Sequence, residues 1–295
     1  MDYIEMSHES LPEAYSPDFE DLKTAESEAP FMEASFYMLR EATHWMAILS
    51  SLKPASPLDR NRAIMRGLLV RLTKLMRLAV RELASQETFM QLSITRDTIE
   101  TAANMQYLLQ DPGDGERFDQ YVMNSLVAER ELLRDIQRNL ADRGGDEWPI
   151  EKRMKRSIEA TAKAAGIDDV TSLPGRSKIG FPSIERRVEL LGLDAYIAYR
   201  MGSVETHGDW HDLFRNHLNY DDGAFSPKVK SMHVRPQVPL MLTILPLTLV
   251  VSRISDLVDD ADVSDFIRPK LEDTLRRARE IDRLHEEFLS PAPPT

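Results

Sequence analysis

Apolar residues recur every three or four positions along most of the chain, which is the spacing of amphipathic α-helices. Pro- and Gly-containing stretches separate these periodic segments. The pattern predicts helices over 31–52, 59–85, 86–110, 116–142, 149–165, 183–191, 194–205, 240–258 and 262–289. No segment keeps the alternation of a β-strand, and no internal repeat is present. The sequence therefore predicts an all-α protein, a helical bundle of roughly 8–10 helices.

The order of these segments predicts one large domain between two different termini. An all-helical domain over 31–289 accounts for the periodic segments, and the longest predicted loop within it is 167–182. A boundary in this loop is compatible with the pattern but is not required by it. Residues 1–30 are predicted to form an acidic, flexible arm, and residues 290–295 form a Pro-rich tail.

The predicted helix 59–85 has an apolar arc on one side and a basic face on the other. The basic face consists of Arg60, Arg62, Arg66, Arg71, Lys74, Arg77 and Arg81. Clustered cationic side chains bind polyanions through charge and counterion release, so the last five of these residues are candidate RNA-binding residues. The alternative is that these side chains pair with acidic residues of neighbouring helices.

The charge distribution along the chain changes how the net charge is interpreted. The protein has 37 Lys and Arg against 49 Asp and Glu, a formal net charge of −12. Residues 1–30 hold nine acidic residues and one lysine, so most of the excess lies in the arm. An acidic protein is expected to avoid nucleic acid, but this argument applies mainly to the arm. The arm is either a solvated terminus or a tethered polyanion that restrains a basic surface.

Several classes of protein are disfavoured by what the sequence does not contain. The chain has no cysteine, which excludes disulfides, thiol catalysis and cysteine–metal sites. Dinucleotide- and phosphate-loop motifs are missing, so no cofactor is expected. No signal peptide or lipidation motif is present, and the apolar run 238–251 is too short to cross a bilayer. We therefore expect a cytoplasmic protein without a membrane partner.

The densest group of chemically active side chains lies in residues 199–212. Within it, Arg200 ends a predicted helix and His207 lies at the following break. An arginine can hold a phosphate and stabilise its transition-state charge. A histidine titrates near neutral pH and can exchange a proton with a ribose hydroxyl or a leaving oxygen. This pair could therefore cut RNA without a metal ion.

Two short stretches resemble a known protein family. Residues 96–109 (RDTIETAANMQYLL) and 199–208 (YRMGSVETHG) resemble the bacterial domain-of-unknown-function family 5677, over about residues 35–255. The second stretch, with its Arg-x6-His spacing, is also similar to the signature of HEPN domains. HEPN domains are all-helical modules found in RNase toxins and antiviral effectors. One departure is Met201, because HEPN nucleases usually carry a polar residue directly after the arginine.

The resemblance implies specific roles for residues of both stretches. It implies a homodimer with a HEPN-like core that cleaves RNA without metal in a toxin or phage-defence setting, with an antitoxin or other protein as a possible partner. Arg200 would contact the phosphate, and His207 would act as acid and base. Beyond the resemblance, we expect Glu100 to orient His207 or Arg200. Substrate contacts are assigned to Arg96, Tyr199 and Ser203. The alternative is a non-catalytic helical adaptor or an RNA- or protein-binding module.

Two other interpretations of residues 199–212 use different chemistry. His207 and His211 have the four-residue spacing of metal ligands, and Asp212 could complete a hydrolase site. The general-base Glu of an HExxH motif is missing, and Gly208 disfavours one helix through both histidines. In the structural interpretation, His207 caps a helix and Ser203 bonds to the backbone.

Overall fold

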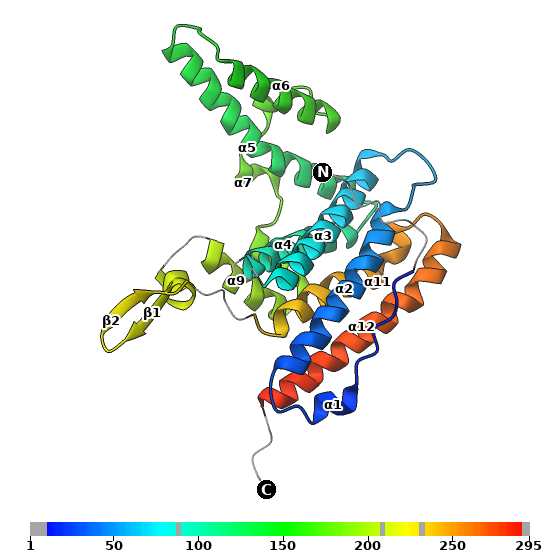
Figure 1. The fold of residues 1–295 in the computed structure, drawn as a ribbon. Helices are drawn as coiled ribbons and strands as arrows, with labels where there is room; N and C mark the ends of the chain where they lie inside the picture. Colours follow the sequence, from blue (N-terminus) through cyan, green and yellow to red (C-terminus); the bar gives the residue numbers. More distant parts are fainter. Residues whose placement is uncertain (1–10, 87–89, 207–209, 230–233, 291–295) are drawn as a thin grey trace. The chain divides into compact units, whose positions relative to one another are not determined.

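The structure is a computed structural model that describes residues 11–86, 90–206, 210–229 and 234–290. Within these residues the protein is all-α apart from one β-hairpin, which confirms the predicted fold class (Figure 1). The N-terminal helices are α1 (Phe19–Lys23), α2 (Ala29–Ser51), α3 (Arg60–Ser85) and α4 (Gln91–Leu109). They are followed by α5 (Gly115–Asp142), α6 (Pro149–Ala164), η1 (Val170–Ser172), α7 (Arg176–Ile179), α8 (Ile184–Val188) and η2 (Glu189–Leu191). The C-terminal elements are α9 (Leu193–Thr206), α10 (Trp210–Asp212), the π-helix η3 (Leu213–His217), β1 (Leu218–Asp221), β2 (Ala224–Pro227), α11 (Gln237–Leu257) and α12 (Ala261–Leu289).

Polar caps explain where several long helices begin. The carboxylate of Asp114 accepts the backbone N–H of Glu116 at 3.0 Å, at the start of α5. Asp260 accepts the N–H of Val263 at 3.1 Å in the same way at α12. These side chains satisfy N–H groups that have no partner inside the helix. The three short helices α1, α7 and α10 raise the number above the roughly 8–10 predicted from periodicity.

The chain divides into two compact units. Unit 1 contains Met1–Leu58, Arg62–Leu109 and Ile184–Thr295, and unit 2 contains Asp59–Asn61 and Gln110–Ser183. Within unit 2, α5 packs against α6, η1 and α7. The guanidinium of the buried Arg130 donates to the carbonyls of Leu173 and Pro174, both at 2.7 Å. Unit 2 therefore has its own internal contacts.

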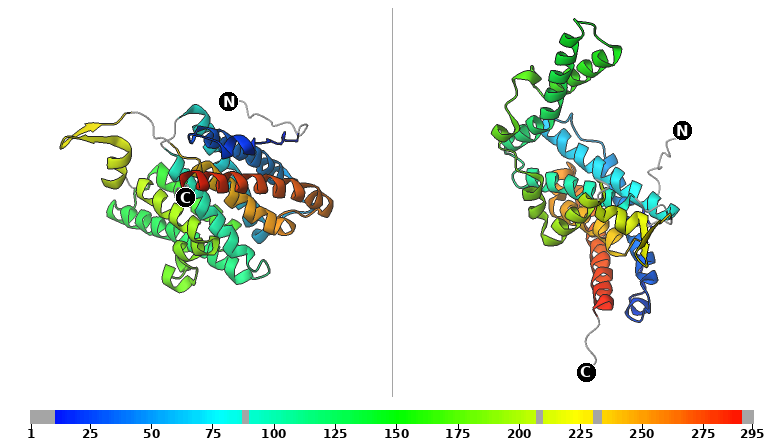
Figure 2. Two further views of the ribbon diagram at one scale, coloured as in Figure 1. Left: turned by 90° about the horizontal axis from the view of Figure 1, so that it is seen from below. Right: turned by 90° about the vertical axis from the view of Figure 1, so that its left-hand side faces the viewer.

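The core of unit 1 is built around α11. This helix packs against α2, α4 and α12, and Figure 2 shows α2, α11 and α12 side by side. By length and composition alone α11 is apolar enough to cross a membrane, but half of its most apolar window is buried in the protein. The apolar side chains of α11 are those expected of a core helix. Its 21 residues exceed the run predicted from sequence.

The N-terminal segment from residue 11 onward is packed, whereas the sequence predicts a flexible arm over 1–30. Leu22 of α1 is buried with Phe31 and Met38 in one apolar cluster. The backbone N–H of Tyr15 donates to the carboxylate of Glu41 at 2.8 Å. The described part of the arm is thus held against α2 and α12 by apolar burial and by this hydrogen bond. Residues 1–10 lie outside the described part of the chain.

The β-hairpin is the main element that the sequence analysis did not predict. β1 and β2 are antiparallel, and Tyr220 is paired with Phe225. The turn residues Asp222 and Gly223 both have positive φ, 46° and 82°. An Asp-Gly pair with this geometry is a strong hairpin signal because its twist matches that of the strands. Each strand has only four residues, too few for alternation to be recognised.

Candidate functional site

The two stretches that carry the family resemblance lie on α4 and α9, which pack closely. A Cβ atom added at Gly202 would lie 2.7 Å from the carbonyl oxygen of Leu92 and 2.8 Å from the Cβ of Arg96. Both distances are shorter than any ordinary contact, so a side chain at this position would push the helices apart. Glycine at position 202 therefore brings residues 200 and 201 of α9 close to the start of α4.

Four predicted site residues lie on these two helices, and Arg96 and Tyr199 contact each other across them. A guanidinium nitrogen of Arg96 lies 2.9 Å from the carboxylate of Glu100, and the guanidinium lies 5.5 Å from the ring centre of Tyr199. Tyr199 is only 5% exposed. The hydroxyl of Ser203 donates to the carbonyl of Tyr199 at 2.9 Å. Arg96, Glu100, Tyr199 and Ser203 thus each have a partner within the fold, and Glu100 pairs with Arg96 rather than with Arg200.

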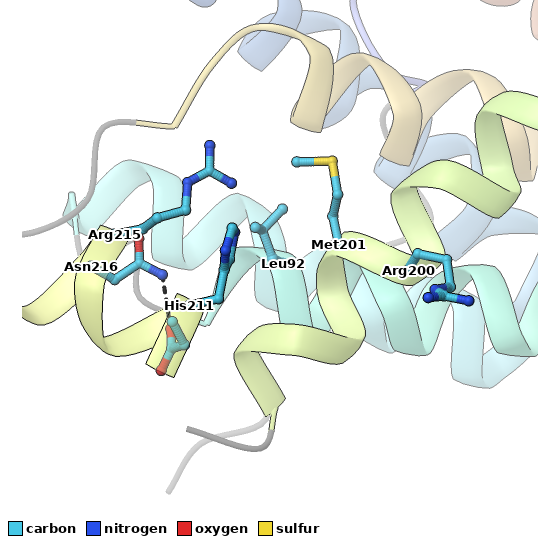
Figure 3. A pocket seen from close by; sticks show the side chains of 7 residues that line it. Leu92, Arg200, Met201, His211, Arg215 and Asn216 are labelled. Carbon is cyan, nitrogen blue, oxygen red and sulfur yellow. Dashed lines mark hydrogen bonds between the residues drawn. The ribbon is translucent and has the colours of Figure 1, made fainter. Parts of the chain in front are cut away.

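A pocket of about 220 Å³ lies where α9 approaches α10 and η3. Its charged and polar lining consists of Arg200, His211, Asp212, Arg215 and Asn216, and its apolar lining consists of Leu92 and Met201. Figure 3 shows His211 and Arg215 on one side, Met201 and Leu92 facing them, and Arg200 farther along α9. The pocket lining therefore includes two arginines and one histidine from two chain segments, and in this view the Arg200 side chain points away from the other two.

The acidic residue in this pocket is already engaged. Asp212 is buried, and its carboxylate accepts the side-chain N–H of Asn216 at 2.8 Å. The Nε2 atom of His217 lies 3.5 Å from the same carboxylate. Arg200 and Arg215, in contrast, are exposed and form no ion pair within the described residues. The closest polar partner of the Arg200 guanidinium there is the hydroxyl of Tyr196 at 3.5 Å.

A second cavity, of about 700 Å³, adjoins this pocket. The two share Leu92, Met201, Arg215 and Asn216. The larger cavity adds the cationic residues Lys228 and Arg235, against one carboxylate among its described lining, Glu28. The ammonium of Lys228 donates to the backbone carbonyl of Arg215 at 3.0 Å, which holds the two basic residues together. Four cationic side chains, Arg200, Arg215, Lys228 and Arg235, thus line two adjoining cavities.

The sequence-predicted basic face on α3 is mostly occupied by contacts within the protein. The guanidinium of Arg66 donates to the carbonyls of Leu257 at 3.0 Å, Leu49 at 3.4 Å and Leu52. These carbonyls belong to the ends of α2 and α11, so Arg66 caps two helices. Its role as an RNA-binding residue stays a prediction.

The remaining basic residues of α3 differ in their surroundings. Arg71 donates to the hydroxyl of Thr101 at 3.1 Å and lies 3.6 Å from the carboxylate of Asp97. Arg77 lies near His44, where burial lowers the pKa of the imidazole and the charge of Arg77 lowers it further. Lys74 and Arg81 are exposed and have no hydrogen bond or ion pair in the described chain. Two of the five candidate residues therefore keep solvent-facing charges without a partner there.

The other charged residues predicted on this face also find partners. Arg60 pairs with Asp119, and Arg62 pairs with Asp259. The described part of the acidic arm contacts α2 and α12. These two arginines therefore fit the alternative interpretation, in which the basic side chains pair with neighbouring acidic residues.

One central residue of the sequence hypothesis, His207, lies outside the described residues, as do Asp209 and His233. Its roles as acid and base and as a metal ligand stay predictions. Among the residues that the structure describes, no three His, Asp or Glu side chains are grouped as metal ligands. The alternative metal site of His207, His211 and Asp212 therefore has two described members, both lining the smaller pocket.

Sequence reasoning missed Arg215, Lys228 and Arg235, and it missed the aromatic residues beside them. Arg215 lies on η3, whereas Lys228 and Arg235 lie in the segment between β2 and α11, and the fold places all three around one cavity. A usable signal was present in the aromatic pair Trp210 and Phe214, which are four residues apart and therefore on one helical face.

Together these features define an all-helical protein with a basic, histidine-containing pocket where α9 approaches α10 and η3. The chain belongs to a family of unknown function, DUF5677, whose profile matches residues 62–225. The match extends from α3 into β2 and includes α4, α9, α10 and η3, which line the smaller pocket. No curated protein and no solved structure matches the chain.

Proposed function

We propose that the basic pocket binds the phosphodiester backbone of RNA and that the protein is a metal-independent endoribonuclease. One observation carries this proposal: Arg200, His211 and Arg215 line a single pocket. Arginine recognises phosphate oxygens through paired hydrogen bonds. The carboxylate of Asp212 is buried and bonded to Asn216, so it does not oppose an anion from an exposed position.

The reaction that fits these residues is an internal transfer on the RNA chain. The ribose 2′-oxygen attacks the adjacent phosphorus while the bond from phosphorus to the 5′-oxygen breaks. One imidazole accepts the proton of the 2′-hydroxyl, and a protonated imidazole donates a proton to the leaving 5′-oxygen. The arginines stabilise the charge that develops on the phosphorane oxygens. The products are a 2′,3′-cyclic phosphate end and a 5′-hydroxyl end.

Two histidines are available for the proton transfers in this proposal. His211 lines the pocket, and His207 precedes it in the chain at the spacing expected from the HEPN resemblance. Two imidazoles in opposite protonation states could divide the two proton transfers. In a homodimer of the kind implied by the resemblance, two such pockets would serve one RNA.

The test is cleavage of total RNA by pure protein in EDTA, with analysis of the product ends. We expect cyclic phosphate ends from the wild type and a fall in rate of about 10²–10⁴-fold for His207→Ala and His211→Ala. Arg200→Ala is expected to lower the rate by about 10²–10³-fold. Arg283→Ala, on the exposed face of α12, is the control and should cleave at the wild-type rate. Cleavage that needs a divalent cation, or that survives all three pocket substitutions, would refute the mechanism.

A second candidate function is a non-catalytic RNA- or protein-binding module, and one observation favours it. Glu100, the residue expected to orient the catalytic pair, is engaged by Arg96 at 2.9 Å within α4. In that case the protein binds RNA with a salt-dependent affinity but leaves it intact in EDTA, with or without magnesium. A toxin or phage-defence role, with an antitoxin as partner, belongs to the catalytic proposal and would be tested by the growth arrest of cells that express the wild type but not His207→Ala.

A further inference from the structure

Four aromatic rings form a cluster on α10, η3 and the β-hairpin. The ring of Trp210 lies 5.9 Å from Phe214 and 5.6 Å from Phe225, measured between ring centres. Tyr220 lies 4.7 Å from Phe225 and 6.4 Å from Phe214. Each ring therefore contacts two others, and we call these four residues the aromatic cluster.

The rings of the aromatic cluster are about half exposed although they contact one another. Their exposed fractions are 60% for Trp210, 55% for Tyr220, 52% for Phe225 and 44% for Phe214. By comparison, Phe31 and Phe118 in the two units are 0% and 1% exposed. Large apolar groups that remain at the surface as one contiguous patch usually mark an interaction site.

The hairpin register places the exposed rings on one face. Tyr220 and Phe225 are directly opposite each other across the two strands, so their side chains point to the same side. The adjacent pair on the side away from the turn, Asn219 and Ser226, points to the other face and is polar. Two strands alone are marginally stable in water, and a ligand on the aromatic face would add contacts to them.

The aromatic cluster adjoins the cationic residues of the pocket. Arg215 follows Phe214 in η3 and lines both cavities, while Lys228 directly follows β2. The ammonium of Lys228 donates to the carbonyl of Arg215 at 3.0 Å, so the end of the hairpin is tied to η3. Flat apolar rings and backbone-binding cations therefore lie in one continuous stretch of the fold.

We infer that the aromatic cluster stacks the bases of single-stranded RNA whose phosphates occupy the adjacent basic cavities. The inference rests on the proposed function, because it assigns the class of RNA that the same site takes. Single-stranded nucleic acids present the faces of their bases, and aromatic side chains beside cationic grooves bind them with little sequence preference. A duplex hides these faces in its own stack and cannot use the cluster. The charge of the neighbouring cavities favours RNA over a second protein copy as the occupant.

The experiment measures the fluorescence of Trp210 during titration with defined anions. Trp148, the other exposed tryptophan, is changed to Phe in all proteins, so that the signal comes from Trp210 and the buried Trp45. The probes are a 12-nucleotide 2′-O-methyl oligoadenylate, which cannot be cleaved at its blocked hydroxyl, the same strand in a duplex, and polyphosphate. We expect the single strand to quench Trp210 and to bind at least about fivefold more tightly than the duplex.

Substitutions separate stacking from charge in the same assay, with binding followed by anisotropy of a labelled strand. Phe225→Ala and Trp210→Ala should each weaken binding of the single strand about tenfold and leave polyphosphate binding unchanged. Arg215→Ala should weaken both ligands. Circular dichroism checks that each variant keeps the helical content of the parent.

Each contrary result has a distinct meaning. If polyphosphate and the single strand bind equally and Phe225→Ala changes neither, the stacking inference is wrong while phosphate binding at the pocket stands. If neither anion binds, the proposed function fails and the inference fails with it. If Trp210→Ala and Phe225→Ala instead turn a dimer into a monomer in sedimentation velocity, with RNA affinity unchanged, the cluster is an interface between copies and the inference is overturned.

Discussion

The arginines inside the helical core and those around the pocket carry the same charge in opposite surroundings. Arg66 and Arg277 are surrounded by acceptors from their own chain: three carbonyls for the first, and the Glu41 carboxylate with the Tyr15 carbonyl for the second. Arg200 and Arg215 are exposed, and no carboxylate of the described chain pairs with them. An arginine near helix ends or carboxylates stabilises the fold, whereas an arginine without such acceptors can bind a ligand. Its place on a charged face of a helix matters less.

The largest expected effect concerns Arg277. Its guanidinium lies within 2.9 Å of both carboxylate oxygens of the buried Glu41. Arg277→Met leaves that carboxylate buried without its partner, so the free energy of unfolding should fall by about 3–5 kcal/mol in urea denaturation. The double variant with Glu41→Gln is the control and should recover part of the loss. An unchanged midpoint for the single variant would mean that this pair does not support the core.

The next largest effect tests whether Arg66 stabilises the fold by capping two helices. Arg66→Met removes a charged donor from three carbonyls and should lower the free energy of unfolding by about 2–3 kcal/mol. Lys74→Met on the same helix is the matched control and should change stability by less than about 0.5 kcal/mol. RNA affinity, measured by anisotropy, should be unchanged in Arg66→Met. If Arg66→Met instead keeps its stability and binds RNA more weakly, the proposed difference between the core arginines and the pocket arginines is wrong.

Arg215→Ala should show the opposite combination. The affinity for RNA is expected to fall about tenfold, a loss of about 1.4 kcal/mol in binding, while the urea midpoint stays the same. The slope of log affinity against log salt should decrease by about one, because one phosphate contact is lost. Arg283→Ala removes an exposed arginine elsewhere and should leave both quantities unchanged. An equal loss from both variants would indicate binding by net charge alone.

The smallest effect concerns a carboxylate that, unlike Glu41, has no hydrogen bond or ion pair in the described chain. Burial raises the pKa of Asp282 first of all, Glu286 and Asp194 raise it further, and His285 lowers it. The folded state therefore holds this proton more tightly than the unfolded state, and stability is lost as the pH rises through the folded pKa. Asp282→Asn should raise the thermal midpoint at pH 7 by about 1–3 °C. The gain should disappear below about pH 4, where the wild-type carboxyl is protonated in both states.

The sequence predicted most of the fold because its information is local. Nearly every long helix was found from apolar periodicity, and the ends of several from Pro- and Gly-containing stretches, as at Pro149. The capping role of Arg66 could not be found this way, because its acceptors come from residues 49, 52 and 257. Arg200 could be named as a candidate because its motif is local. Its neighbour in the pocket, Arg215, is recognised only when α9 and η3 are placed together.

The insertion of unit 2 into unit 1 has a consequence for the order in which the chain folds. Ile99 and Ala103 of α4 pack with Val188, Ala195 and Tyr199, so the contacts beside the pocket join segments separated by residues 110–183. Closing a loop of that size costs conformational entropy, whereas the contacts of α5 with α6 and α7 are closer in sequence. We expect unit 2 to collapse early and thereby shorten the effective loop. The packing of α4 against α9, beside the proposed active site, would then be the last part of the fold to form.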